Sequence, residues 1–333
     1  MKKILQQLFE YKTLSRGQAK EILINIAKGI YNDAEVTAFA TVYLMRTVAI
    51  EELQGFTDAL LELCVKVDLS EYETIDIVGT GGDGKNTFNI STLSCFIVAG
   101  AGQKVVKHGN YGATSVSGSS NVMELLGYTF KADNSKLKKE LEQANICFLH
   151  APAFHPALKT VAPIRKSLGL RTFFNMLGPV VNPAQPKYQV LGVYNLEMAR
   201  IYNYFLQQTG RLYAIVHSLD GYDEISLTSD VKLITNNGER IVTPQELGKR
   251  QVSAVDLYGG NTAEDAANIF KTIIQGNGSW AQNAVVLANA AVALHCTGKY
   301  NSYSDAYNAA VGSLESGKAK QCLDKLITLN DNK

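Results

Sequence analysis

The stretch IDIVGTGGDGKNTFNIST, residues 75–92, decides the fold of this chain. Its first four residues have the β-branched character of a buried strand, and an apolar segment with helical character follows its last two. Closely spaced glycines lie between them, at positions 79, 81, 82 and 84. The stretch therefore predicts a strand, a glycine-rich turn and a helix, which together open an α/β domain.

The glycine turn matches the pattern G-x-G-x-x-G, which is a weak signal by itself. A dinucleotide fold would also place an acidic residue about 20 positions further on, but the chain has no Asp or Glu from Gly84 to Met123. Instead, unobstructed backbone N–H groups precede Asn89, Ser91 and Thr92 at the expected helix start, which favours binding of a diphosphate. The alternative is a tight strand-to-helix turn with Ser91 as the N-cap.

Short apolar runs alternate with helical segments beyond this stretch. The runs lie at 104–108, 145–150, 188–194 and 212–218, and helical patterns cover 262–276, 279–297 and 302–327. The alternation predicts an α/β fold with a mostly parallel central sheet flanked by helices.

The first 65 residues show helical patterns alone and predict three or four short helices. Ser15 with Gln18 and Asn32 with Glu35 form capping-box patterns. One apolar stripe comprises Val36, Phe39, Ala40, Tyr43 and Leu44. Because the polar stretch 66–74 ends this pattern, we expect a small all-α N-terminal domain at 1–72 and a larger α/β domain at 73–333.

Composition limits the function classes. The 333 residues include 32 Lys+Arg and 31 Asp+Glu, a net charge of +1, which gives no global field to hold a nucleic acid. Five cysteines without a C-x-x-C pair suit a reducing cytoplasm. The N-terminus lacks a signal-peptide pattern, and the most apolar late stretch, 284–294, is too short to span a bilayer. We expect neither a nucleic-acid nor a membrane partner.

Two long windows of the sequence, residues 84–123 and 143–196, lack carboxylates. We interpret their absence as an effect of the negative charge of a ligand. In the first, a hydroxyl-rich loop follows Lys107 and suits a phosphate and sugar hydroxyls; a surface loop without function is the alternative. In the second, Arg165 is a candidate for a substrate carboxylate, with Pro179 and phenylalanines against an aromatic ring. The alternative for Arg165 is a solvated basic helix face.

Asp223 and Glu224 are adjacent acids just after the expected strand at 212–218. Such pairs usually lie on solvated surface. Beside a diphosphate, however, Mg²⁺ takes one or two carboxylates together with phosphate oxygens and water, so this pair is the candidate metal site.

Five motifs in this order resemble the anthranilate phosphoribosyltransferase family. They are GTGGDGKNTFNIST at 79–92, KHGN at 107–110, SGSSNVMELLG at 117–127, HPALKTVAPIRKSLGLRTFFNMLGPVVNPA at 155–184 and GYDEIS at 221–226. The resemblance covers nearly the whole chain. It implies a fold like that of nucleoside phosphorylases and phosphoribosyltransferases, with a helical segment near 160–180 completing the helical domain.

The resemblance also implies the reaction. Anthranilate displaces diphosphate from 5-phosphoribosyl 1-diphosphate (PRPP) and gives N-(5-phosphoribosyl)anthranilate, the second step of tryptophan biosynthesis from chorismate. It further implies a cytoplasmic homodimer that associates through the helical domain, and Mg²⁺, usually two ions per subunit.

Three sets of residues match the family's sites. The PRPP set is Gly79, Gly82, Asp83, Thr87, Asn89, Ile90, Ser91, Thr92, Lys107, His108, Gly109, Asn110, Tyr111, Gly112, Ala113, Thr114, Ser115 and Ser119. The anthranilate set is Gly79, Asn110, Arg165, His108, His155 and Pro179, and the metal set is Ser91, Asp223 and Glu224. No residue is assigned as a general base, because anthranilate is a neutral aryl amine whose proton can leave late.

The chain departs from the family's pattern at three positions. Tyr111 stands where Arg is common, Val116 where Lys is frequent and Asn121 where Asp is frequent. The loss of two cations leaves open which groups hold the 5′-phosphate or the diphosphate, although Tyr111 can still donate one hydrogen bond.

Two alternative functions stay open. A pyrimidine-nucleoside-phosphorylase-type enzyme would share the layout and the phosphate loop, but its characteristic glycine and lysine signatures are missing. A non-enzymatic nucleic-acid-binding relative should show a basic surface and a degraded site, whereas this chain has balanced charge and retains the five motifs.

Overall fold

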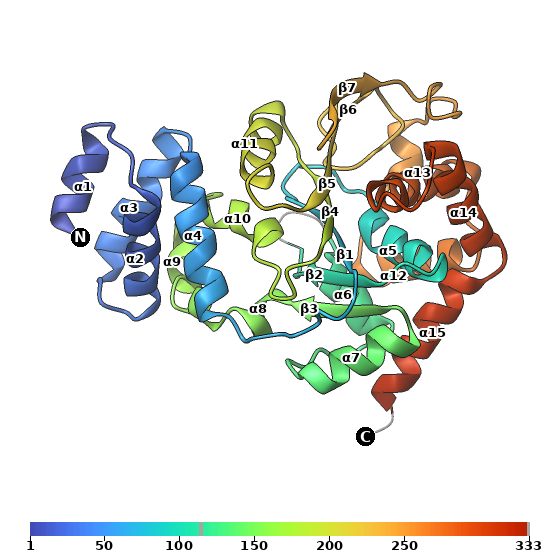
Figure 1. Ribbon diagram of the computed structural model, residues 1–333, viewed down its shortest axis with the longest axis horizontal. Helices are drawn as coiled ribbons and strands as arrows, with labels where there is room; N and C mark the ends of the chain where they lie inside the picture. The colour runs from blue at the N-terminus through green and yellow to red at the C-terminus, as the bar shows by residue number, and fades with distance from the viewer. Residues whose placement is uncertain (113–115, 332–333) are drawn as a thin grey trace. The chain divides into compact units, whose positions relative to one another are not determined.

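The structure is a computed structural model, and it describes residues 1–112 and 116–331. The chain divides into two compact units (Figure 1). Unit 1 comprises Met1–Val67 and Ala151–Gln185, and unit 2 comprises Asp68–His150 and Pro186–Lys333.

Unit 1 is helical. Its N-terminal segment contains α1 (Lys2–Phe9), α2 (Arg16–Ala27), α3 (Asp33–Met45) and α4 (Ile50–Leu63). Its second segment contains α8 (Ala151–Phe154), η1 (Pro156–Lys159), α9 (Ala162–Leu168), α10 (Phe174–Leu177) and η2 (Gly178–Val180). Both expected capping boxes are present, with Ser15 before α2 and Asn32 before α3. The expected apolar stripe of α3 is buried except for Leu44, whose side chain is exposed, so including Leu44 was wrong.

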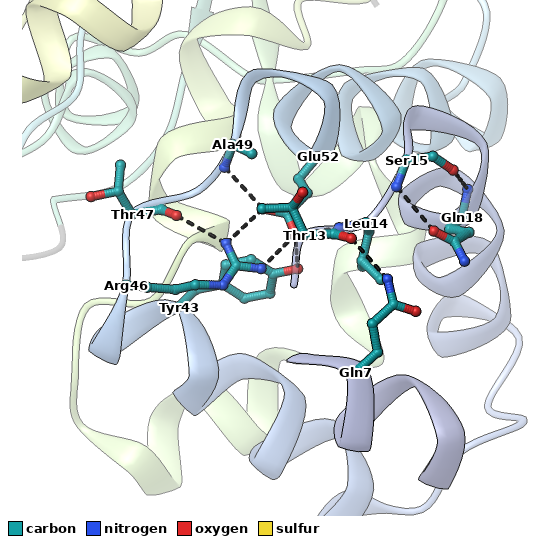
Figure 2. A network of polar contacts seen from close by, with 10 residues as sticks. All are labelled: Gln7, Thr13, Leu14, Ser15, Gln18, Tyr43, Arg46, Thr47, Ala49 and Glu52. Atoms are coloured by element: carbon teal, nitrogen blue, oxygen red, sulfur yellow. Dashed lines mark hydrogen bonds and ion pairs between the residues drawn. The ribbon is translucent and has the colours of Figure 1, made fainter. Parts of the chain in front are cut away.

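A buried carboxylate joins the elements of unit 1. Glu52 is fully buried and accepts hydrogen bonds from the backbone N–H groups of Leu14 and Ala49 at 2.9 Å each, and from the hydroxyl of Tyr43 at 3.2 Å. The guanidinium of Arg46 forms a two-pronged ion pair with it at 2.5 and 2.8 Å (Figure 2). A single carboxylate thus ties the α1–α2 loop, α3 and the start of α4 together.

Unit 2 is built on a seven-stranded sheet of order β3-β2-β1-β4-β5-β6-β7. The strands are β1 (Ile75–Gly79), β2 (Val105–Gly109), β3 (Ile146–His150), β4 (Tyr188–Gly192), β5 (Leu212–Ser218), β6 (Val231–Thr235) and β7 (Gly238–Val242). The first five pair in parallel, and β6 and β7 add an antiparallel edge. The expected α/β class and mostly parallel sheet are confirmed.

Helices cover the sheet of unit 2. They are α5 (Ile90–Gly100), α6 (Ser119–Leu125), α7 (Asn134–Gln143), α11 (Leu196–Leu206), η3 (Ala254–Leu257), α12 (Ala263–Ile274), α13 (Trp280–Cys296), α14 (Tyr303–Glu315) and α15 (Lys318–Asp331). Figure 1 shows α5, α13 and α14 on one face of the sheet and α11 on the other. The helices α5 and α13 are apolar around almost their whole circumference because they form the core of this unit.

Two expectations for unit 2 need correction. The antiparallel pair β6–β7 was not expected, although the two-residue turn between its strands consists of Asn236 and Asn237, a residue type favoured in turns. The helical pattern at 302–327 is two helices rather than one, because the chain turns at Ser316 and Gly317, where Gly317 has a φ of +74°.

The strand order places the site. The chain leaves β1 towards β2 on one side, and β4 lies on the other side, with Gly79 in register with Gly192. In open α/β sheets, ligands bind outside the carboxyl ends of the strands where the order reverses in this way. The glycine turn begins at this point.

Among the described helices, none combines the length and the apolar character needed to cross a bilayer.

Candidate active site

The glycine turn leaves the end of β1 with backbone conformations that suit glycine. Gly81, Gly82 and Gly84 have φ values of +62°, +80° and +73°. Gly79 is required for a different reason, since a Cβ there would overlap a carboxylate oxygen of Asp223. A Cβ on Gly192 at the end of β4 would overlap the carbonyl oxygen of the same residue.

The acidic pair is built into the strand ends and does not lie on solvated surface. An Oδ2 atom of Asp223 accepts the N–H of Gly81 at 2.7 Å, and Oε1 of Glu224 accepts the N–H of Ser91 at 2.9 Å. The side chain of Asp223 is buried and that of Glu224 half-buried. These bonds join the segment after β5 to both the glycine turn and the first turn of α5.

Asn289 on α13 holds this acidic segment from behind. Its Oδ1 accepts the N–H of Ile225 at 3.0 Å, and its Nδ2 donates to the carbonyl of Ile225 at 2.9 Å. Sequence reasoning did not find this role. The signal was present, because Asn289 is the one polar side chain in the apolar run 284–294, and a buried amide needs partners.

Three carboxyl groups influence one another's ionisation at the acidic pair. Burial, and then the charge of Asp83, raises the pKa of Asp223 to about 7. Burial also raises the pKa of Asp83, and burial with the charge of Asp223 raises that of Glu224 well above its ordinary value. The protein alone therefore penalises the ionised state of these carboxylates, and a bound divalent cation would remove that penalty.

A buried lysine, Lys107, lies next to the start of α5. Lys107 is buried, and its Nζ donates to the carbonyl of Ile77 at 2.7 Å and lies 3.5 Å from Oγ of Ser91. Within the described ranges no group of three or more His, Cys, Asp or Glu side chains is arranged to hold a metal ion. Asp223, Glu224 and the hydroxyl of Ser91 are oxygen donors of the kind that Mg²⁺ takes together with phosphate oxygens and water.

The start of α5 differs in detail from the expectation. The helix begins at Ile90 with Asn89 in the N-cap position, so Ser91 is not the N-cap. The side chain of Asn89 does not cap this end: its Nδ2 instead donates to the carbonyl of Ser117 at 3.2 Å. One helix-start N–H, that of Ser91, is already occupied by Glu224.

A second segment supports the glycine turn. Nδ2 of Asn86 donates to the carbonyl of Gly260 at 2.8 Å, and its carbonyl accepts the N–H of Gly259 at 2.9 Å. Thr87 forms an isolated antiparallel bridge with Tyr258. In addition, Nζ of Lys85 lies 4.6 Å from the ring centre of Tyr222, next to the acidic pair. None of these supporting contacts has a recognisable sequence signature.

The expected phosphoribosyl loop follows β2. His108 is buried, while Gly109 and Asn110 reach the surface, and Oγ of Ser119 donates to the carbonyl of Asn110 at 3.3 Å. Ala113, Thr114 and Ser115 were assigned to this loop and lie outside the described residues.

Unit 1 carries the other expected anthranilate residues. The guanidinium of Arg165 on α9 lies 5.9 Å from the ring centre of Phe174, and its Nη2 donates to Oδ1 of Asn175 at 3.4 Å. Burial lowers its pKa, and within the described ranges no carboxylate shifts that pKa. His155 is fully buried and bonds to the backbones of Leu60 and Val181, and burial lowers its pKa to about 4. Pro179 is buried in η2.

Burial explains part of the carboxylate-free windows. The buried helix α5 and the buried strand β2 lie within 84–123, and the buried strands β3 and β4 lie within 143–196. Carboxylates are disfavoured at such positions whatever binds nearby.

Known proteins match both units. Residues 71–320 match the glycosyl transferase family, a/b domain, and residues 2–64 match the helical bundle domain of the glycosyl transferase family. The fold and the site thus define a glycosyl transferase with a helical bundle and an α/β domain.

Relatives narrow the assignment. The anthranilate phosphoribosyltransferases of Christiangramia forsetii and Bacteroides fragilis are 55% and 57% identical to this chain, over 100% and 99% of it and 100% of each relative. This chain belongs to the anthranilate phosphoribosyltransferase family.

Solved structures agree with this assignment. The enzyme of that name from Thermus thermophilus has a TM-score of 0.92 at 29% identity, covering 98% of this chain and 99% of its own. The enzyme from Saccharomyces cerevisiae in complex with PRPP and Mg has a TM-score of 0.90 at 27% identity, covering 99% and 97%. These similarities favour the phosphoribosyltransferase interpretation over both alternatives.

Proposed function

We propose that this chain transfers the phosphoribosyl group of PRPP to the amine of anthranilate and releases diphosphate, a step of tryptophan biosynthesis. The observation that carries the proposal is the docking of Asp223 and Glu224 onto the glycine turn and the α5 start, at 2.7 and 2.9 Å. This contact supports a site in which carboxylates suited to a metal adjoin the glycine turn and helix start proposed for the diphosphate, and breaking the bond to that leaving group requires its charge to be stabilised.

The metal set is proposed as Ser91, Asp223 and Glu224, with two Mg²⁺ ions per subunit. Bound Mg²⁺ supplies positive charge where the departing diphosphate gathers negative charge. The chain itself contributes the glycine turn at the end of β1 and the cation of Lys107, which lies 3.5 Å from the Ser91 hydroxyl. These groups are fixed before the reaction, so little reorganisation accompanies the charge transfer.

The residues of unit 1 are proposed to hold anthranilate. Arg165 is a partly buried cation that bonds to a neutral amide, so a substrate carboxylate is the partner that would stabilise it most. Orientation of the neutral aryl amine then replaces a general base, since the nucleophile needs no prior deprotonation. His155, being fully buried, is proposed to support this segment from within.

The experiment follows anthranilate fluorescence with purified protein, PRPP and Mg²⁺, omitting each component in turn. We expect the signal to fall in the complete mixture alone, and chelation of the metal to stop it. If the fluorescence still fell after thorough chelation, the reaction would not need the metal, and the metal assignment would be contradicted. No loss in any mixture, together with release of free base from thymidine or uridine by phosphate, would favour the phosphorylase alternative.

We further propose a cytoplasmic homodimer that associates through the helical unit. Exposed apolar side chains gather on its first elements, with exposed fractions of 61% for Phe9 and 82% for Met45. Their burial against a second copy would remove apolar surface from water. The cytoplasmic assignment is supported by the cysteines, which are all free among the described residues.

A further inference from the structure

The loop after β2 has a narrow neck where its two arms touch. A Cβ on Gly118 would overlap the backbone of Tyr111 and Gly112, and a Cβ on Gly109 would overlap Oγ of Ser119. The carbonyl of Asn110 also accepts the N–H of Ser120 at 3.2 Å. The outgoing arm, 109–112, therefore packs directly on the returning arm, 117–121.

One atom joins the two arms. Oδ1 of Asn121 accepts the N–H of Gly112 at 3.1 Å and the N–H of Gly118 at 3.0 Å. An acceptor shared by both arms fixes their separation, because neither N–H can move without losing a hydrogen bond to a half-buried group. It also occupies the N–H of Gly112, which is consequently not free for a phosphate.

Tyr111 fastens the outer side of the neck to the body of unit 2. Its hydroxyl donates to Oε1 of Glu124 on α6 at 2.8 Å, and its ring meets the ring of His150 edge-on at 4.8 Å. His150 is itself fixed, with Nδ1 2.9 Å from Oγ of Ser120 and its ring stacked on Phe130. The hydroxyl of Tyr111 is therefore bound to α6 and does not point into the interior of the loop.

We propose that Asn121 is a positioning residue that closes this neck and so holds Asn110 in place for the phosphoribosyl site, with Tyr111 as its support. The proposal rests on the proposed function of that site. It gives a role to two of the chain's departures from its family's pattern together: Asn121 closes the neck and Tyr111 supports it. Val116, which is exposed, has no role in it.

The first test uses Asn121→Ala in the full-length enzyme. We expect hydrogen exchange of the amides at 109–112 and 117–120, measured without substrate, to become faster. We also expect the KM for PRPP to rise roughly fivefold or more, with kcat and the KM for anthranilate within about twofold. A variant that merely lost active protein would instead show a lower apparent kcat and an unchanged KM.

The second variant, Asn121→Asp, retains an acceptor oxygen at the same place. It should restore slow exchange and bring the KM for PRPP to within about threefold of wild type, because a carboxylate oxygen accepts both N–H groups. Asn236→Ala is the matched control: Asn236 accepts the N–H of Tyr213 at 2.8 Å at the amino end of β5, and its loss should leave both readouts of the neck unchanged.

Three results would overturn the proposal: wild-type exchange in Asn121→Ala, an unchanged KM for PRPP in that variant, or Asn121→Asp behaving like Asn121→Ala. Hydrogen exchange needs no substrate, so it tests whether Asn121 closes the neck even if the wild-type protein fails to consume anthranilate. Such a failure would count against the proposed function and not against the closed neck.

Discussion

Arg165 shows how one side chain can be costly to the folded protein and useful to its reaction. Its guanidinium is partly removed from water, which lowers its pKa, and its partners are an amide oxygen and an aromatic ring. A buried cation without a counter-ion destabilises the fold. A carboxylate on the substrate would supply the missing counter-ion, and the stabilisation of the cation would then contribute to substrate affinity.

We therefore expect Arg165→Ala to raise the KM for anthranilate about tenfold or more, the effect of losing a charged hydrogen bond, while the KM for PRPP changes little. Steady-state kinetics with each substrate varied in turn measures both. Lys166→Ala is the matched control, since Lys166 is its exposed neighbour on α9. Unchanged anthranilate kinetics in Arg165→Ala would show that this residue does not bind the carboxylate.

At the scale of elements, short helices depend on polar joints as much as on apolar packing. The helices α2, α3 and α4 have 12, 13 and 14 residues, lengths at which an isolated helix is marginal in water. Around Glu52, the end of α3 and the beginning of α4 share one carboxylate with the loop before α2 (Figure 2). These hydrogen bonds fix the arrangement of the helices, because each hydrogen bond requires a particular direction between donor and acceptor.

Replacement of this carboxylate should therefore strongly destabilise the folded protein. We expect Glu52→Gln to reduce the free energy of unfolding by about 3 kcal/mol, because it leaves Arg46 partly buried without its counter-charge. Denaturant unfolding followed by circular dichroism measures the change. Glu51→Gln alters the same chemistry one residue earlier, on an exposed side chain, and should stay within about 0.5 kcal/mol. Equal stabilities of the two variants would contradict the role of the joint.

For the whole molecule, the proposed dimer would bury exposed apolar side chains of unit 1 such as Met45. We expect Met45→Glu to weaken self-association, because a charge would have to be buried in the interface. Analytical ultracentrifugation over a range of concentrations measures the dissociation constant. Val255→Glu, at a residue of unit 2 that is 75% exposed, should leave it unchanged. A wild-type chain that sediments as a monomer at micromolar concentration would refute the dimer.

The sequence predicted the parts of the fold that rest on local patterns. Five apolar runs coincide with β1 to β5, and both capping boxes with the starts of α2 and α3. The edge hairpin β6–β7 was missed because its strands are partly polar and only partly buried. The break at Gly317 was missed because apolar periodicity continues on both sides of it.

The sequence predicted the neighbourhood of the glycine turn and the acidic pair but not the contacts that support it. Both were singled out because phosphate and Mg²⁺ bind such groups, and the structure brings them into hydrogen-bond contact. The contacts made by Asn289, Asn86 and Asn121 join segments that lie far apart along the chain or across a loop. No local pattern encodes such contacts, because each depends on where the tertiary fold brings a backbone N–H or C=O.

The close approach of Asp223 to Gly79 and Gly192 couples two properties that could otherwise vary independently. The same two glycines define the spacing of β1 and β4 and the seat of the acidic segment. A backbone shift that opened room for even a methyl group would move the carboxylate away from the glycine turn. Over evolutionary drift, the geometry of the sheet and that of the metal site can therefore change only together.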